Sequence, residues 1–214
     1  MKIVCISDLH TYMAQVVVPP CDLVICSGDV SFMGEENEVR MFLTWFSLLP
    51  VKHRVFVAGN HDFLFEKNPV HAAAMLSEFR GITYLENSSV IIDGLKIWGS
   101  PWTPEFHNWA FNANSDKRRS IWSQIPDDVD ILITHGPPMG ILDKLSGTNE
   151  SVGCPHLAKN VVRIKPKLHV FGHIHEGYGM VERDGVIYIN ASTCNLDYKP
   201  VNKPVIIDIE MTEV

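Results

Sequence analysis

The chain has 214 residues, of which 46% are hydrophobic, and 18 basic against 25 acidic side chains give it a net charge of −7. This length and composition predict a single domain, 1–214, and the acidic balance argues against long nucleic acid as a partner. Five cysteines without C-x-x-C spacing, no run of 18 apolar residues and no signal-peptide run at the start indicate a cytoplasmic protein with reduced, buried thiols and no membrane contact.

Short apolar runs of strand length recur along the chain, and each ends at polar or glycine residues. These runs are 2–6, 23–26, 54–57, 131–134 and 168–171. Between the second and third, residues 35–49 place apolar side chains at helical spacing, and acidic residues crowd the first turn. Asn68 and Pro69 form a cap and first-turn pair that predicts a helix to about Arg80, which Gly81 ends. Strands that alternate with helices predict an α/β fold.

The second half of the chain adds hairpins to this pattern. Residues 89–98 and 181–189 each contain two apolar runs around an Asp-Gly turn, which predicts a β-hairpin. Ser115 is a candidate cap for a helix, 155–164 predicts another helix closed by the proline that follows it, and 204–209 predicts a last strand. Hairpins beside parallel strands imply mixed sheets.

A polar cluster follows each of the five strand-length runs. The clusters contain Asp8 and His10, Asp29, Asn60 with His61 and Asp62, His135, and His173 with His175. Loops at the carboxyl ends of strands in an open α/β sheet converge on a common crevice, so we expect these side chains to meet in space. Carboxylate, amide and imidazole donors without thiolate suit Mn²⁺, Fe or Zn²⁺. Leaving His61 and Asp62 aside, the donors are too many for one ion, which predicts two divalent ions roughly 3.5 to 4 Å apart with positions open for water and substrate.

The order and spacing of these motifs resemble the calcineurin-like metallophosphoesterase superfamily. The motifs are Asp8-x-His10, Gly28-Asp29, Gly59-Asn60-His61-Asp62, His135 and Gly172-His173-x-His175. Residues 100–112, 134–138, 166–179 and 190–194 further resemble the brain-type metallophosphoesterase-domain-containing proteins, a subgroup linked to phosphodiester and cyclic nucleotide hydrolysis. The resemblance implies a four-layer αββα sandwich of two mixed β-sheets flanked by helices, an α/β fold that some schemes class as α+β.

The same resemblance implies roles for individual residues. Asp8, His10 and His175 would hold one metal; Asn60, His135 and His173 would hold the other; Asp29 would bridge them. Apart from the resemblance, His61 is adjacent to a ligand but surplus to the metal count, so it is free to stabilise charge on the phosphoryl group or protonate the leaving oxygen. Asp62 either orients His61 or caps the segment that follows. In the aromatic loop, Trp102, His107 and Asn108 are candidate substrate contacts, with ordinary packing of aromatic rings as the alternative. The histidines His53, His71, His156 and His169 are assigned to the surface or the core.

The expected activity is that of a binuclear metal-dependent phosphodiesterase acting on small phosphodiesters, 2′,3′- or 3′,5′-cyclic nucleotides among them. The expected chemistry is in-line attack of a metal-bridging hydroxide, with Mn²⁺ as the first choice of metal and Fe or Zn²⁺ as alternatives. The ligand set leaves open a phosphomonoesterase, a short-oligonucleotide nuclease and a metal-independent protein-binding module. A monomer or a homodimer is expected.

Overall fold

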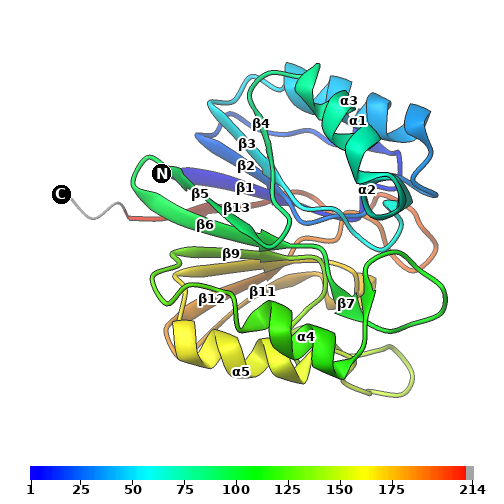
Figure 1. Ribbon diagram of the computed structural model, residues 1–214. Coiled ribbons are helices and arrows are strands. Elements are labelled where there is room, and N and C mark those ends of the chain that lie inside the picture. Colours follow the sequence, from blue (N-terminus) through cyan, green and yellow to red (C-terminus); the bar gives the residue numbers. More distant parts are fainter. Residues whose placement is uncertain (211–214) are drawn as a thin grey trace.

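Two β-sheets stacked face to face form the centre of the computed structural model, which describes residues 1–210 (Figure 1). The first sheet has the strand order β13-β1-β2-β3-β4. Its strands are β1 (Lys2–Ile6), β2 (Leu23–Cys26), β3 (His53–Phe56), β4 (Ile82–Tyr84) and β13 (Val205–Asp208). Strands β1 to β4 are parallel, and β13 pairs with β1 in the antiparallel sense. The first sheet is therefore mixed.

The second sheet has the order β11-β12-β10-β9-β6-β5. Its strands are β5 (Ser88–Ile92), β6 (Leu95–Ser100), β9 (Ile131–Thr134), β10 (Leu168–Phe171), β11 (Gly179–Arg183) and β12 (Val186–Asn190). Strands β6, β9, β10 and β12 are parallel, whereas β5 and β11 are the antiparallel arms of the two predicted hairpins. A small pair, β7 (Thr103–Pro104) and β8 (Asn112–Ala113), lies outside both sheets.

Helices cover the outer face of each sheet (Figure 1). The first sheet carries α1 (Glu36–Leu48), α2 (Phe63–Lys67) and α3 (Pro69–Ser77); the second carries α4 (Ser115–Trp122) and α5 (Pro155–Ile164). Successive side chains of a strand point to opposite faces, so β1 contributes Ile3 and Cys5 to the core between the sheets and Val4 and Ile6 to the core beneath α1. The predicted four-layer αββα sandwich is confirmed.

Element boundaries differ from the predictions where local hydrogen bonds decide them. Helix α3 ends at Ser77 rather than Arg80, because the next amides bond three residues back, Glu78 to Met75 and Phe79 to Leu76. The cap of α4 is Asn114, whose side chain accepts from Lys117 N, rather than Ser115. Helix α5 closes at Lys165, which is left-handed with φ +49°, before the proline.

The arrangement of the sheets places the polar clusters at one end of the sandwich, where the carboxyl ends of the parallel strands lie. The carboxyl ends of the parallel strands of each sheet point the same way, and a bridge between Ser7, after β1, and Ser192, after β12, joins the two sheets at that end. Four of the five cysteines are buried, Cys21 is half-buried and all five are free. In the part of the chain from 1 to 210, no helix has the length and apolar character needed to cross a bilayer.

Candidate metal centre

Loops after five strands bring the predicted ligands to this end of the sandwich. The loops after β1, β2 and β3 supply Asp8 and His10, Asp29, and Asn60 with His61; those after β9 and β10 supply His135, and His173 with His175. Asp8, His10 and His135 are fully buried, and Asp29, Asn60 and His61 are at most 5% exposed. Such burial of carboxylates and imidazoles calls for partners of opposite charge or for a metal.

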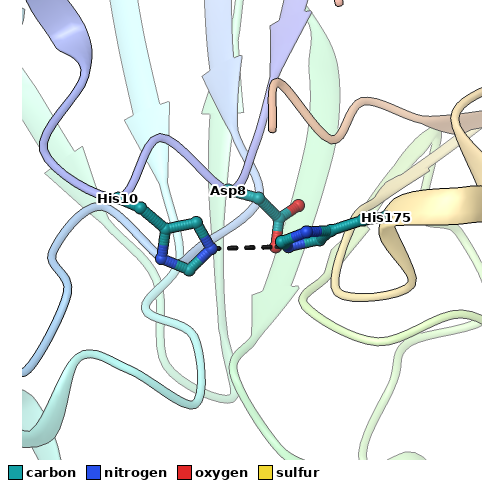
Figure 2. A group of neighbouring side chains, drawn as sticks. All are labelled: Asp8, His10 and His175. Atoms are coloured by element: carbon teal, nitrogen blue, oxygen red, sulfur yellow. Dashed lines mark hydrogen bonds and ion pairs between the residues drawn. The ribbon is translucent and has the colours of Figure 1, made fainter. Parts of the chain in front are cut away.

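The first group consists of Asp8, His10 and His175, whose side chains point toward one another (Figure 2). The Nε2 atoms of His10 and His175 are 3.4 Å apart, and His175 Nε2 lies 3.5 Å from Asp8 Oδ1. One ligand atom from each of the three residues lies within 4.8 Å of the others. The group therefore has the composition and closeness that a cation site needs.

The second group consists of Asp29, His135 and His173. Asp29 Oδ2 lies 3.4 Å from His135 Nε2, and Asn60 Oδ1 lies 2.8 Å from the same nitrogen. Asp29 Oδ2 also lies 3.8 Å from His10 Nε2, so this oxygen reaches both groups. A third possible grouping joins Asp29 and His10 with His61, whose Nε2 is 4.0 Å from Asp29 Oδ2.

Backbone carbonyls orient three of the imidazoles. The Nδ1 atoms of His61, His135 and His175 lie 2.7, 2.9 and 2.9 Å from the carbonyl oxygens of Phe32, Ser27 and Asn195. A carbonyl only accepts hydrogen bonds, so each Nδ1 carries a proton and the neutral ring keeps its lone pair on Nε2. The Nε2 atoms of His135 and His175 then face the two carboxylates, which is the donor arrangement that a divalent metal would accept.

Hydrogen bonds also fix the carboxylates. Asp8 accepts from Ser192 Oγ at 2.8 Å and from His173 N at 3.1 Å, while Asp29 Oδ1 accepts from His61 N at 2.8 Å. Two of these donors belong to the polar loops themselves. Asp29 Oδ2 is thereby left to face the Nε2 atoms of the surrounding imidazoles.

Asp62 serves the loops rather than the ring of His61. Its carboxylate accepts from Gly59 N at 2.7 Å, Ser31 N at 3.0 Å and Ser31 Oγ at 2.5 Å. In residues 1–210 no hydrogen bond joins it to the His61 imidazole, and it makes no side-chain cap to α2. Burial and the charge of Asp29 raise the pKa of Asp62 to about 6. Asp62 is thus a positioning residue that ties the Asn60 loop to the segment after Asp29.

Burial and charge shift the pKa values of the site in opposite directions. For Asp8 and Asp29 burial raises the pKa, but the neighbouring histidines, His175 and His135 foremost, outweigh it and hold both values below the usual range. Burial lowers the pKa of His10 and that of His173 to about 4. The charges of Asp29 and Asp8 overcome burial at His135 and His175, whose pKa values rise to about 9. The centre thus attracts positive charge: His10 and His173 are neutral at neutral pH, whereas His135 and His175 would each release a proton when a metal binds.

A cleft of about 680 Å³ opens onto the centre. Asp29, Asn60, His61, His173 and His175 form its floor, and its walls include Glu105, Phe106, His107, Trp109, Arg118, Glu150, Glu176 and Tyr198. Of the three candidate substrate contacts, only His107 lines the cleft. Trp102 packs 5.3 Å from the Phe111 ring beneath Lys117, and Asn108 is exposed outside the wall. The loop conformation, which spacing does not reveal, causes this difference.

Three residues of the site, Trp109, Asn195 and Tyr198, were not among the sequence candidates; a fourth, Ser192, follows a predicted strand, but the sequence does not decide whether it reaches the site. The Trp109 ring lies 4.2 Å from the His61 ring and is tilted from it by 37°, and the other three follow β12 and reach Asp8, His175 and His10. The signal available in the sequence was the strand predicted to end at residue 189. Because β12 pairs in parallel with β10, the residues that follow β12 lie at the same end of the sheet as the candidate ligands.

Comparisons with known proteins agree with this geometry. The family described as calcineurin-like phosphoesterase matches residues 1–177. Metallophosphoesterase domain-containing protein 1 of Homo sapiens is 37% identical over 230 residues, which cover 97% of this chain and 71% of the relative. An Arcobacter nitrofigilis protein named "Probable glycerophosphodiester phosphodiesterase GpdQ" is 24% identical over 184 residues, 78% of this chain and 64% of the relative. The solved structure of TT1561 from Thermus thermophilus is similar in fold, with a TM-score of 0.61 and 14% identity over 88% of each chain.

Proposed function

The chain belongs to the calcineurin-like phosphoesterase family, and we propose that it is a phosphodiesterase that works with two divalent ions, Mn²⁺ first among them. The position of Asp29 carries the proposal. Its Oδ2 lies 3.8 Å from His10 Nε2 in one group and 3.4 Å from His135 Nε2 in the other. One carboxylate oxygen within reach of both groups is what a bridging ligand requires.

The donor set fits two ions. Asp8, His10 and His175 would hold one, Asn60, His135 and His173 the other, and Asp29 would be shared. Bound there, the ions would neutralise phosphoryl oxygens and lower the pKa of the attacking water. The lone pairs directed inward by the carbonyls behind His135 and His175 support this assignment.

His61 has the position of a proton donor to the leaving oxygen. Its Nδ1–H donates to the Phe32 carbonyl at 2.7 Å, which fixes the ring and steadies a positive charge on it. Its Nε2 faces the cleft floor, 4.0 Å from Asp29 Oδ2. Asp62 acts through the backbone, because its bonds to Gly59 N and Ser31 hold the loop that carries Asn60 and His61.

The charge of the cleft walls favours diesters over monoesters. Glu105, Glu150 and Glu176 line the walls, where Arg118 is the one arginine or lysine among the residues that line this cleft. A phosphodiester carries one negative charge and a monoester nearly two at neutral pH, so the acidic walls repel the monoester more. The name of the Arcobacter relative, a glycerophosphodiester phosphodiesterase, also supports the diester.

The test compares bis(4-nitrophenyl) phosphate with 4-nitrophenyl phosphate, because both release the same chromophore. Each is assayed with Mn²⁺, Fe²⁺, Zn²⁺ and Mg²⁺, beside 2′,3′- and 3′,5′-cyclic nucleotides. We expect metal-dependent hydrolysis with the diester preferred, and an Asp29→Ala variant that loses it. Faster hydrolysis of the monoester than of the diester would mean that the protein is a phosphomonoesterase. Wild-type rates in Asp29→Ala would contradict a metal centre in which Asp29 is shared.

Metal analysis tests the division of ligands between the two ions. A His173→Ala variant should retain about one ion of the pair after Mn²⁺ loading and desalting, since the donors of the first group are untouched. Loss of both ions from this variant would contradict the division, and well under one ion per chain in the wild type would favour a metal-independent binding module.

A further inference from the structure

Aromatic rings surround His61 where the cleft meets the metal centre. The Trp109 ring lies 4.2 Å from the His61 ring and the Tyr198 ring lies 6.0 Å from it, measured between ring centroids. The Tyr198 ring also lies 4.9 Å from His10 and 5.4 Å from His175. Trp109 and Tyr198 both line the cleft and are both half-buried, so part of each ring stays open to a ligand. Aromatic rings that only pack in the hydrophobic core would be fully buried.

The Tyr198 loop is held in an unfavourable backbone conformation. Tyr198 has φ +55°, a left-handed value that bulky residues rarely adopt. Asn195 stabilises the loop, because its Oδ1 accepts from the amides of Asp197 at 3.1 Å and Lys199 at 3.0 Å. The Asn195 carbonyl accepts from Tyr198 N and also lies 2.9 Å from His175 Nδ1. One residue thus fixes Tyr198 relative to a candidate metal ligand.

The backbone next to Trp109 is bonded in a similar way to Asn60, beside the second group of candidate ligands. The amide of Ala110, the next residue, donates to the carbonyl of Asn60 at 3.0 Å. Phe63 packs 6.0 Å from the Trp109 ring and limits its movement. Each ring is therefore anchored through the backbone next to a candidate ligand, Asn60 for Trp109 and His175 for Tyr198.

We propose that Trp109 and Tyr198 determine specificity by selecting diesters whose ester group beside His61 is a flat aromatic one, in preference to a small alkyl group. This inference rests on the proposed function, which puts the leaving oxygen at His61. A flat group bound there meets two aromatic surfaces and gains from stacking and from burial of apolar area, whereas a methyl group gains little from either.

Binding of two uncleaved probes tests the inference without requiring catalysis. The probes are methylphenylphosphinic acid and dimethylphosphinic acid, monoanions that contain no ester bond and differ only in a phenyl or a methyl group on phosphorus. Isothermal titration calorimetry on the Mn²⁺-loaded protein gives the ratio of their dissociation constants. We expect the wild type to bind the phenyl probe at least tenfold more tightly. Trp109→Leu and Tyr198→Leu should each reduce the ratio by about 2- to 12-fold.

Two further variants control for structural effects. Tyr198→Phe should keep the wild-type ratio, because it retains the ring. Trp45→Leu, the same kind of substitution in α1 on the far side of the first sheet, should keep it too. A wild-type ratio near one, or an unchanged ratio in both leucine variants, overturns the inference even where diester hydrolysis is metal-dependent. Absence of metal-dependent hydrolysis with every metal overturns the proposed function instead, whatever the ratio.

Discussion

Gly172 lies between β10 and the histidine pair, and its missing side chain makes room for Asp8. A Cβ built at Gly172 would stand 2.1 Å from Asp8 Oδ2, 2.1 Å from Ser7 Oγ and 2.7 Å from Ser7 Cβ. Ordinary contacts begin at 3.4 Å, so a Gly172→Ala substitution must move the carboxylate oxygen or the strand end by more than an ångström. Ser192 Oγ and His173 N hold that carboxylate from two sides, which leaves it little freedom to adjust.

The size of the displacement sets the size of the effect. Metal–ligand distances tolerate about 0.2 Å, so the expected shift removes Asp8 from the first group. A misplacement of about 1 Å at a catalytic centre costs on the order of 100-fold in rate. The crowding itself should lower the free energy of unfolding by about 1 to 3 kcal/mol, the usual cost of overpacking a buried site. We therefore expect a folded variant with a defective first metal site.

Metal content and diester hydrolysis measure the two effects separately. Gly172→Ala, loaded with Mn²⁺ and desalted, should hold fewer ions than the wild type and hydrolyse bis(4-nitrophenyl) phosphate about 100-fold more slowly. Gly136→Ala is the matched control, because it also adds a methyl group beside a metal-site histidine, but its nearest neighbours are Thr103 Cγ2 at 3.2 Å and His173 Cδ2 at 3.9 Å. Ser192→Ala, which removes one hydrogen bond to Asp8 without crowding, should give an intermediate defect. Wild-type metal content and rate in a folded Gly172→Ala protein would refute the steric reasoning.

Three further predictions concern stability. Asp62→Asn replaces an acceptor oxygen by a donor opposite the amides of Gly59 and Ser31, and urea unfolding should show a loss of about 1 to 3 kcal/mol; an unchanged midpoint would contradict the role of Asp62 as an anchor. Burial lowers the pKa of His169 to about 3 from 6.5, so between these pH values the unfolded chain binds one proton more than the folded chain at this residue. As the pH falls below 6.5, His169 alone should therefore lower the free energy of unfolding by about 1.4 kcal/mol per pH unit. His169→Leu should reduce that slope by one proton in urea titrations of the metal-free protein from pH 6 to 4, and equal slopes would exclude His169 as the source. Removal of divalent ions by a chelator should lower the melting temperature and Mn²⁺ should restore it, since an ion at 100 times its Kd adds about 2.7 kcal/mol; an unchanged melting temperature would argue against bound metal.

The sequence sufficed to predict the longer strands and the residues that meet at their ends. Buried parallel strands read as apolar runs, and each run here stops at a polar residue that the topology brings to one end of the sandwich, as Asp8 and His135 show. Parallel strands and hairpins both carry strong local signals, so mixed sheet pairing could also be predicted, whereas the division into two sheets was implied by the family resemblance. Very short elements such as β4, β7 and β8 carry no periodicity, and they were missed.

The cleft walls could not be predicted, because loop conformation decides which side chain faces inward. Trp102 and Trp109 lie in the same aromatic loop, yet Trp102 packs on Phe111 and Trp109 on His61. Spacing gives no reason to prefer one over the other. Tyr198 reaches His10 only because a non-glycine residue takes a left-handed conformation, which the sequence signals weakly if at all.

The backbone at the centre indicates a site that is built before a metal arrives. Asp8, His10, Asp29 and His173 all have left-handed φ values, between +39° and +69°. Each such residue costs about 1 to 3 kcal/mol and persists only where the surroundings fix it. The surroundings here are protein groups: Asp8 N donates to Gly28 O, His10 N to Asp29 O, and His173 N to Asp8. Because hydrogen bonds within the chain hold the ligands in place, metal binding should add stability without rearranging the loops, and hydrogen exchange in the two polar loops after β1 and β2 should be slow in the metal-free protein as well.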